Sequence, residues 1–357
     1  MISYFTKMYQ AVPALSQLQQ ALGGGFVSTR ATTIRAIQAN YPEANAAKIS
    51  RFFQHQSVGS RQLVQSDLIV TGSPNNSLLK PFKAKKIMVF HGTFAPLSIA
   101  EAKSMAHFDQ LCVIGSRMMH IIEQAGMRDK AVMSGYLPFL EHPAKDAAIK
   151  QQFLLNLGLD PNNKTVLYLP AGRPIGSWDL MAEKLVREIP AEFNLILRPH
   201  PSGSVTARFK DKLGFERMQN VIKKRGNAYL DLTAQKLSHL FAHADLVISD
   251  GTSPAEEALY YDLPQLFVQT NRYSSAVAKQ ILLDKNIEAT HVESVLKLYD
   301  CGGVLMQNAS NITRLVENAL LNAPQFAQQR SDYFNYVFGS RDNIAQKSLI
   351  ESLRQYV

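Results

Sequence analysis

Three short segments place side chains suited to acid–base or phosphate chemistry directly after apolar runs. The first is Phe90-His91-Gly92-Thr93, at the end of the apolar run 87–90. Histidine titrates near neutral pH, so His91 can accept a proton from an attacking hydroxyl group, and the glycine after it lets a ligand approach the backbone closely. The competing interpretation is a buried structural histidine. The position of His91 at the end of an apolar run, followed by Gly-Thr, favours a general base.

The second segment is Arg198-Pro199-His200-Pro201, which follows the apolar run 194–197. Its two prolines stiffen the turn. Arg198 can bind phosphate oxygens through two parallel hydrogen bonds, and His200 can donate a hydrogen bond to a transferring phosphate. A surface loop with incidental charge is the alternative. We predict a phosphate-binding turn, with His200 as a second catalytic residue and Arg198 as a donor-binding residue.

The third segment is Asp250-Gly251-Thr252-Ser253-Pro254, after the apolar run 246–248. Thr252 or Ser253 can cap a following helix, and a proline suits its first turn. The N–H groups and hydroxyls at such a helix start can bind a diphosphate. Capping alone explains Thr-Ser-Pro, but not so readily its combination with Asp-Gly and an upstream Arg-Pro-His turn. We therefore predict that Asp250, Gly251, Thr252 and Ser253 bind a nucleotide diphosphate.

A fourth and weaker segment is Leu169-Pro170-Ala171-Gly172-Arg173, in which Gly172 leaves room for a ligand and Arg173 can bind its phosphate or base. The chain contains no GxGxxG dinucleotide loop, no GxxxxGK[ST] phosphate loop and no HExxH metal pair. We therefore expect neither a cofactor nor a metal ion.

The elements that carry these segments are short, continuously apolar runs, as in strands that are buried on both faces of a parallel sheet. They are expected at residues 67–70, 87–90, 110–114, 131–133, 165–169, 194–197, 246–248 and 265–268. Helical segments alternate with them, which indicates an α/β fold with right-handed crossovers. In such sheets ligands bind outside the carboxyl ends of the strands, where the four segments lie.

The strand series breaks between Glu141 and Lys164, where a helix and the turn cluster 158–163 intervene. We expect two facing Rossmann-like domains around a cleft, residues 1–150 and residues 151–335. Residues 336–357 are expected to form a C-terminal helix that packs back on the first domain. An amphipathic helix is expected from Met8 to Leu22, to cap the core or to lie on a membrane.

The composition limits the class of protein. Hydrophobic residues are 46% and charged residues 19%, which is typical of a globular protein. The net charge of +9 can attract anionic substrates or anionic lipid headgroups, but basic and aromatic residues do not interleave as they do in nucleic-acid-binding proteins. With two distant cysteines and no signal peptide or spanning segment, we expect a cytoplasmic protein in reversible contact with the inner membrane surface.

The ordered set of segments resembles the CDP-glycerol glycerophosphotransferase family. The resemblance covers His91-Gly92-Thr93 after an apolar strand, the Leu169-Pro170 segment with its Arg173, Arg198-Pro199-His200, and the segment that ends in Asp250-Gly251-Thr252-Ser253. It implies a GT-B-like fold and an enzyme of teichoic acid or capsular polymer synthesis. It also implies that His91 is the base, and that His200, Thr252 and Ser253 hold the donor diphosphate.

By this resemblance, the second domain binds CDP-glycerol or a related CDP-polyol, and the first domain presents the hydroxyl of a lipid-linked or polymer acceptor. The acceptor oxygen attacks the polyol-side phosphorus, and CMP leaves. Two alternatives stay open. One is a GT-B glycosyltransferase or nucleotide-sugar epimerase that uses a UDP- or CMP-sugar, which the paired Glu256-Glu257 resembles. The other is a noncatalytic scaffold.

Overall fold

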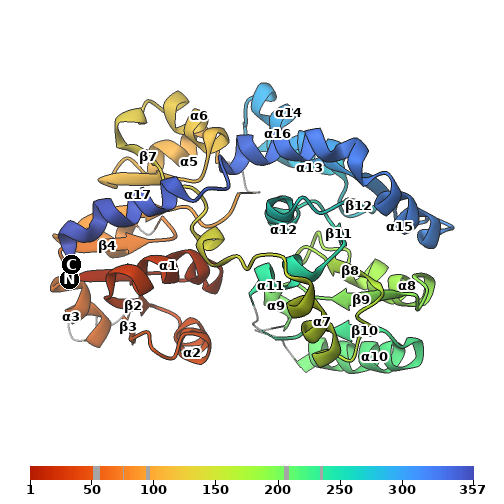
Figure 1. Ribbon diagram of the computed structural model, residues 1–357. Coiled ribbons are helices and arrows are strands. Elements are labelled where there is room, and N and C mark those ends of the chain that lie inside the picture. The colour runs from red at the N-terminus through yellow and green to blue at the C-terminus, as the bar shows by residue number, and fades with distance from the viewer. Residues whose placement is uncertain (51–56, 75, 94–96, 205–208, 234–235) are drawn as a thin grey trace. The chain divides into compact units, whose positions relative to one another are not determined.

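The computed structural model describes residues 1–50, 57–74, 76–93, 97–204, 209–233 and 236–357 (Figure 1). The chain forms two compact units, each built on one sheet. The first unit combines residues 1–141 with residues 335–357, and the second comprises residues 142–334. Both sheets are parallel and carry helices, so the predicted class of two parallel α/β domains is confirmed.

The first sheet has the strand order β3-β2-β1-β4-β5-β6-β7, and each neighbouring pair is parallel. Its strands are β1 (Ile2–Phe5), β2 (Gly25–Ser28), β3 (Ala46–Lys48), β4 (Leu68–Thr71), β5 (Lys85–Val89), β6 (Gln110–Val113) and β7 (Ala131–Met133). Its helices are α1 (Val12–Leu22), α2 (Ala31–Asn40), α3 (Val58–Val64), α4 (Asn76–Leu79), α5 (Ile99–Ser104), α6 (Ser116–Gln124) and α17 (Ile344–Leu353).

Alternate residues of the first sheet enter two apolar clusters, one on each face. Tyr4 and Val70 pack with Leu15 and Leu18 of α1 and with Leu349 of α17. The other face holds a second cluster, in which the strands pack against α3 and α4. The apolar side of α1 is therefore part of the core of this unit, as the first of the two interpretations of the segment 8–22 expected.

The second sheet has the order β10-β9-β8-β11-β12-β13 and is also parallel throughout. Its strands are β8 (Lys164–Leu169), β9 (Phe193–Leu197), β10 (Ala228–Leu230), β11 (Leu246–Ser249), β12 (Gln265–Gln269) and β13 (Gly303–Met306). Its helices are α7 (Ala147–Asn156), α8 (Trp178–Glu188), α9 (Pro201–Ser204), α10 (Phe209–Arg225), α11 (Leu237–His243), α12 (Ser253–Ala258), α13 (Ser275–Asp284), α14 (Ala289–Leu296) and α15 (Ile312–Leu321).

The strands of the second sheet are buried on both faces. Tyr168 and Ile248 point into a cluster with α8, α10 and α15, whereas Leu167 and Val247 point into a cluster with α7 and α11. The eight strands expected from continuous apolar runs are all present. β1, β2, β3, β10 and β13 were not expected.

The division of the chain lies nearer the N-terminus than the expected boundary after residue 150. That boundary falls inside α7, whose Leu154 packs with Leu167 and Phe241 in the core of the second unit. The whole of α7 therefore belongs to the second unit, which begins at His142. Helix α16 (Ala327–Phe338) carries the chain back into the first unit.

Across the described ranges, no helix combines the length and the apolar composition needed to cross a membrane.

Candidate donor site

Three of the four predicted segments meet at one edge of the second sheet. Strand β8 lies between β9 and β11, and the registers pair Tyr168 with Leu197 and Leu169 with Ser249. Strands β8, β9 and β11 end at Leu169, Leu197 and Ser249, so the three parallel strands end at nearly the same level. The segments that follow them therefore lie at the same carboxyl edge, as the sequence predicted.

Asp250 holds the loop that follows β8. Its Oδ2 accepts hydrogen bonds from the backbone N–H of Ala171 at 2.6 Å and of Ser177 at 2.9 Å. Asp250 is 1% exposed, and this burial raises the pKa of its carboxyl group against the lowering effect of the hydrogen bonds. The carboxylate thus joins both ends of the loop 171–177 to the end of β11. Its role here is to position the loop that carries Gly172 and Arg173.

The ring of His200 lies against Gly172 of this loop. A Cβ atom at Gly172 would lie 3.1 Å from Nδ1 of His200, which explains why glycine suits the position. Burial lowers the pKa of His200, although the residue is partly exposed. A neutral imidazole keeps one N–H, so His200 can still donate a hydrogen bond to a phosphate oxygen at neutral pH.

Arg198 forms an ion pair that the sequence analysis did not predict. Its Nη1 lies 2.6 Å from Oδ2 of Asp231, and both side chains are largely buried, at 11% and 1% exposure. Asp231 follows β10 and accepts a further hydrogen bond from the Thr233 hydroxyl. The guanidinium therefore joins the ends of β9 and β10 beside His200. Local sequence does not reveal this pair, because the two residues follow different strands.

Gly251 makes the turn between β11 and α12. Its φ of +69° lies in the left-handed region, and a Cβ there would lie 2.9 Å from the ring of Tyr299. The turn directs Thr252 and Ser253 toward the start of α12, where both are partly exposed. Among the described residues, the Thr252 hydroxyl makes no capping hydrogen bond to this helix. Helix capping therefore does not explain the presence of the Thr252 hydroxyl at this position.

The substitution Gly251→Ala should destabilise the second unit by about 1–3 kcal/mol, because alanine disfavours a positive φ and its methyl group meets the Tyr299 ring. Urea unfolding measures this difference. Gly214→Ala is the matched control, since Gly214 lies in α10 with open space around it. There the substitution should leave the stability unchanged or raise it. Equal effects at the two sites would contradict the steric account.

Arg173 lies beside a residue that the sequence analysis missed. Its Nη2 is 3.5 Å from Oδ1 of Asp179, in the first turn of α8. The other oxygen of Asp179 lies 3.7 Å from Nη1 of Arg272. Arg272 follows β12, the strand next to β11. A fourth strand end thus adds a cation to this edge. The available signal was a basic residue four positions after the end of the apolar run 265–268.

His91, in the first unit, follows β5, and its ring lies against Gly72 after the neighbouring β4. A Cβ at Gly72 would lie 3.4 Å from Nδ1 of His91. Burial lowers the pKa of His91, against a smaller raising effect of a hydrogen bond with the Gly72 backbone. The ring is therefore neutral at neutral pH, which is the state that a general base requires.

A second residue supports the His91 turn. Arg117, near the start of α6, donates from Nη2 to the carbonyl oxygen of Thr93 at 2.7 Å, and it is 4% exposed. Cations are unfavourable in the first turn of a helix, so an arginine at this position was a signal that sequence analysis passed over. Residues 94–96 of this segment lie outside the described residues.

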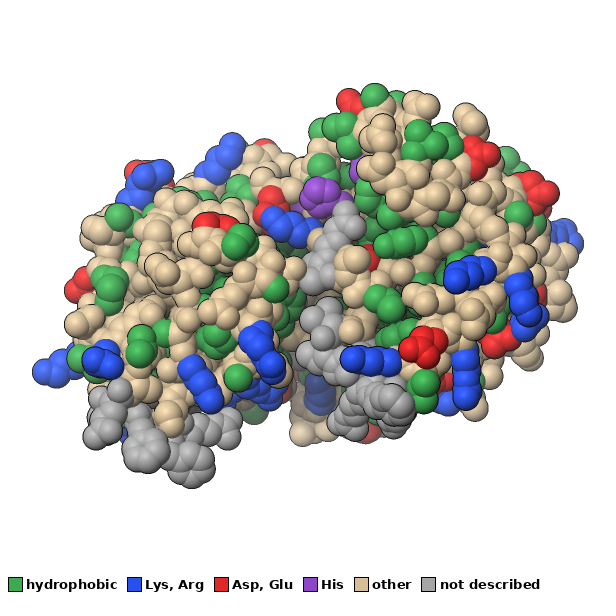
Figure 2. Space-filling model, turned by 90° about the horizontal axis from the view of Figure 1, so that it is seen from below, with side chains coloured by type: hydrophobic (Ala, Val, Ile, Leu, Met, Phe, Trp, Pro, Cys, Tyr) green, Lys and Arg blue, Asp and Glu red, His purple; other side chains and the backbone are tan. Residues whose placement is uncertain are grey.

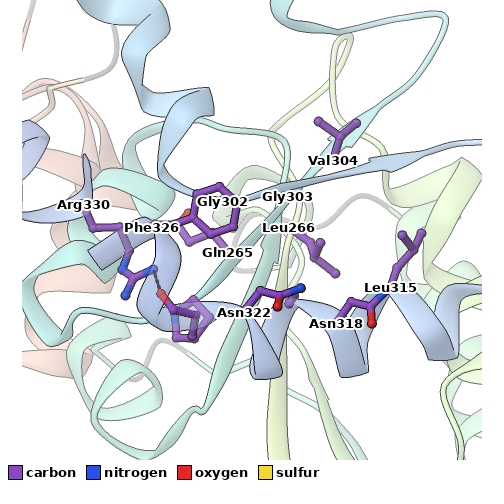
Figure 3. A pocket seen from close by; sticks show the side chains of 13 residues that line it. Gln265, Leu266, Gly302, Gly303, Val304, Leu315, Asn318, Asn322, Phe326 and Arg330 are labelled. Carbon is purple, nitrogen blue, oxygen red and sulfur yellow. Dashed lines mark hydrogen bonds between the residues drawn. The ribbon is translucent and has the colours of Figure 1, made fainter. Parts of the chain in front are cut away.

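Two further features of the surface are the distribution of its basic side chains and one pocket. Figure 2 shows Lys and Arg side chains distributed over one face of the molecule, without one continuous basic surface. A pocket of about 150 Å³ lies at the opposite, amino edge of the second sheet, where Gln265 and Gly303 begin their strands (Figure 3). It includes none of the predicted site residues. Within the described part of the chain, no three His, Cys, Asp or Glu residues are grouped to hold a metal ion.

No protein-family model matches the chain, and no curated protein matches it in sequence. Solved structures do match. A histidine-to-alanine variant of the wall teichoic acid polymerase TagF matches with a TM-score of 0.67 and 14% identity, over 99% of this chain and 88% of that chain. A histidine-to-asparagine variant of TagF with CDPG matches with a TM-score of 0.65, at the same identity and coverage.

HepE from Anabaena, in complex with UDP-glucose, matches with a TM-score of 0.54 and 12% identity, over 99% of both chains. At sequence identities of 12–14%, these structural matches establish the fold alone. The resemblance seen in the sequence motifs is thus confirmed at the level of the fold, and this chain has the two-domain α/β fold of the wall teichoic acid polymerase TagF.

Proposed function

We propose that this chain is a transferase that moves a glycerol-phosphate, or a related polyol-phosphate, from a CDP-activated donor to an acceptor hydroxyl group. The observation that carries the proposal is the meeting of His200, the Gly172 loop and the Asp250–Ser253 turn at one carboxyl edge. The fold shared with TagF supports it, because a TagF structure contains CDPG. The acceptor is proposed to be lipid-linked or polymeric.

In this proposal the donor diphosphate is bound by the second unit. His200 donates a hydrogen bond to a phosphate oxygen, and the hydroxyls of Thr252 and Ser253 contact the diphosphate. Asp250 acts through the backbone of the loop 171–177 that it holds, and Arg198 acts beside His200 while it is paired with the Asp231 carboxylate. Fixed donors stabilise charge at the phosphorus without reorganisation.

The reaction transfers one phosphoryl group. The acceptor oxygen forms a bond to the polyol-side phosphorus, the bond from that phosphorus to the bridging oxygen of CMP breaks, and CMP leaves with the electron pair. His91 takes the proton of the acceptor hydroxyl. A neutral His91 suits this role, and the burial that lowers its pKa keeps it neutral.

A second candidate is a glycosyltransferase with a uridine nucleotide-sugar, favoured by the likeness to HepE with UDP-glucose. The paired Glu256-Glu257 was one reason for this alternative. Glu256 is 0% exposed and accepts a hydrogen bond from the Tyr333 hydroxyl at 2.7 Å. Glu256 is therefore bound to a partner inside the protein and does not face a ligand. Glu257, which is partly exposed, remains the residue through which this candidate would contact a sugar or ribose.

Calorimetric titration of the purified protein with CDP-glycerol, CMP and UDP-N-acetylglucosamine tests the donor. We expect binding of CDP-glycerol and CMP that is at least tenfold tighter than binding of the uridine ligand, a difference of about 1.4 kcal/mol or more. His200→Ala should weaken CDP-glycerol binding by about tenfold through the loss of one hydrogen bond to a charged group. Preference for the uridine ligand would instead support the glycosyltransferase.

The control for His200→Ala is Arg187→Ala. Arg187 lies on α8 and pairs with Glu183 on the exposed surface, at 64% and 56% exposure. This variant should bind CDP-glycerol like the wild type. Absence of binding of all three ligands to the wild type would favour the noncatalytic scaffold.

A further inference from the structure

One exposed carboxylate in the second unit lies between two arginines from different strand ends. Asp179 contacts Arg173, after β8, at 3.5 Å and Arg272, after β12, at 3.7 Å. The three side chains are 44%, 57% and 41% exposed. All three are therefore accessible from solvent at the carboxyl edge of the second sheet.

The turn that presents Arg272 is well fixed. The Thr270 hydroxyl accepts hydrogen bonds from the backbone N–H of Arg272 and of Tyr273, both at 3.1 Å. The backbone N–H of Thr270 in turn donates to the Tyr273 carbonyl at 2.8 Å. Thr270 and Tyr273 are buried, at 8% and 3% exposure. The backbone at Arg272 thus has a defined position while its side chain reaches solvent.

This turn is joined to the predicted donor segment. The side chains of Tyr273 and Tyr299 interact electrostatically, and the ring of Tyr299 is the group that a Cβ at Gly251 would meet. Burial raises the pKa of Tyr299 to about 12, so the pair is neutral. Arg272 is therefore held in place by the same packed residues that support the Gly251 turn.

Both guanidinium groups converge on one exposed carboxylate. The cluster therefore places two cations side by side on the edge where the donor segments lie. The planar guanidinium matches the geometry of phosphate oxygens, and arginine remains charged at every physiological pH. A diphosphate carries enough negative charge to bind both arginines in competition with the Asp179 carboxylate.

We propose that Arg272 and Arg173 form an anion-binding clamp for the donor diphosphate, and that Asp179 occupies this clamp when no anion is bound. The identity of the nucleotide in the clamp rests on the proposed function, whereas the clamp itself requires only a diphosphate. Arg272 is then a donor-binding residue contributed by β12, a strand from which the sequence analysis predicted none.

Titration calorimetry with inorganic pyrophosphate, CDP and UDP tests the clamp in four proteins: wild type, Arg272→Ala, Asp179→Asn and Arg187→Ala. Arg272→Ala should bind the diphosphate ligands about tenfold more weakly, with a flatter dependence on salt concentration. Asp179→Asn should bind them a few-fold more tightly, because a competing negative charge is removed. Arg187→Ala breaks an exposed ion pair of the same helix and should leave the affinity unchanged.

The proposal is overturned if Arg272→Ala keeps wild-type affinity and salt dependence, or if Asp179→Asn weakens binding as Arg272→Ala does. It is also overturned if the wild type binds none of the three diphosphates. Preference for UDP over CDP, with the same effects of the variants, would reject the proposed CDP donor and leave the clamp supported. Circular dichroism and urea unfolding should show that all four proteins fold alike, since the substituted side chains are exposed.

Discussion

Replacing His91 with alanine is expected to lower the turnover of CDP-glycerol by about 10²–10⁴-fold while donor affinity stays within about twofold of the wild type. The reason is that a general base acts only on the acceptor proton, whereas the residues proposed to bind the donor belong to the second unit. CMP release under saturating donor measures turnover, and titration calorimetry measures affinity. The result separates catalysis from binding.

The matched control for this variant is His120→Ala. His120 lies on α6 of the same unit, exposed, with Nε2 3.2 Å from the Gln124 amide nitrogen. Its replacement should change neither turnover nor affinity. Near-normal turnover in His91→Ala would remove His91 from the mechanism. Equal losses of affinity and turnover would instead give it a role in binding.

The pH dependence of turnover provides a second test of His91 as the general base. A base works in its unprotonated form, so turnover falls when the pH drops below the pKa of His91. Burial lowers this pKa below the ordinary histidine value of 6.5, so the acidic limb of the pH–rate profile should have its midpoint below pH 6.5. A midpoint above pH 6.5 would contradict the assignment. The limb should be absent in His91→Ala.

The second large effect is expected for Asp250→Ala, which should lower the stability of the protein. Alanine there removes the acceptor of two buried backbone N–H groups, those of Ala171 and Ser177. Each buried donor left without a partner costs about 1–3 kcal/mol, so the free energy of unfolding should fall by about 2–6 kcal/mol. Urea unfolding measures it. The loop that carries Gly172 and Arg173 should also lose its fixed position, which lowers donor affinity.

Asp250→Asn separates the hydrogen bonds from the charge. Both hydrogen bonds end on one carboxylate oxygen, and the amide oxygen of asparagine can take that place. We expect a loss of no more than about 1 kcal/mol at neutral pH. Asp284→Ala is the surface control, because Asp284 is exposed and accepts only from Gln280 in the described structure. A loss in Asp250→Asn as large as in Asp250→Ala would show that the charge itself is required.

The sign of the pH effect at Asp250 follows from its raised pKa. Because burial raises the carboxyl pKa above its ordinary value of 3.8, the folded protein binds the proton more tightly than the unfolded chain. The stability linked to this proton is present at acidic pH and is lost as the pH rises through the folded pKa. The stability of Asp250→Asn relative to the wild type should therefore be highest near neutral pH and should decrease toward acidic pH.

Much of the second sheet could be predicted from local sequence. The runs before Arg198 and Asp250 are continuously apolar because their strands are covered on both faces, and this pattern needs no knowledge of the fold. The chemistry-bearing residues follow those runs directly. Once the strands are parallel and adjacent, their carboxyl ends meet, so the gathering of the segments around His200 also followed from the sequence.

The first strand shows where local pattern is insufficient. β1 lies in the interior of the first sheet, between β2 and β4, and its four residues are all buried. Ser3 interrupts the apolar run, and its hydroxyl accepts a hydrogen bond from the Ser66 hydroxyl at 2.7 Å. A polar residue inside a central strand is stable only with such a partner. The partner lies more than 60 residues away, so the sequence around β1 does not reveal it.

The sequence by itself determined the parallel α/β class, the order of the segments and the placement of His91, His200 and Thr252 at strand ends. The tertiary structure decided which charged side chains face one another. Arg198 was expected to bind phosphate, and only the adjacency of β9 and β10 reveals Asp231 as its partner. Arg272 gains its significance from Asp179 on α8. The physical reason is that strand identity depends on local burial, whereas ion pairing depends on the order of strands in the sheet, which brings residues distant in sequence within a few ångströms.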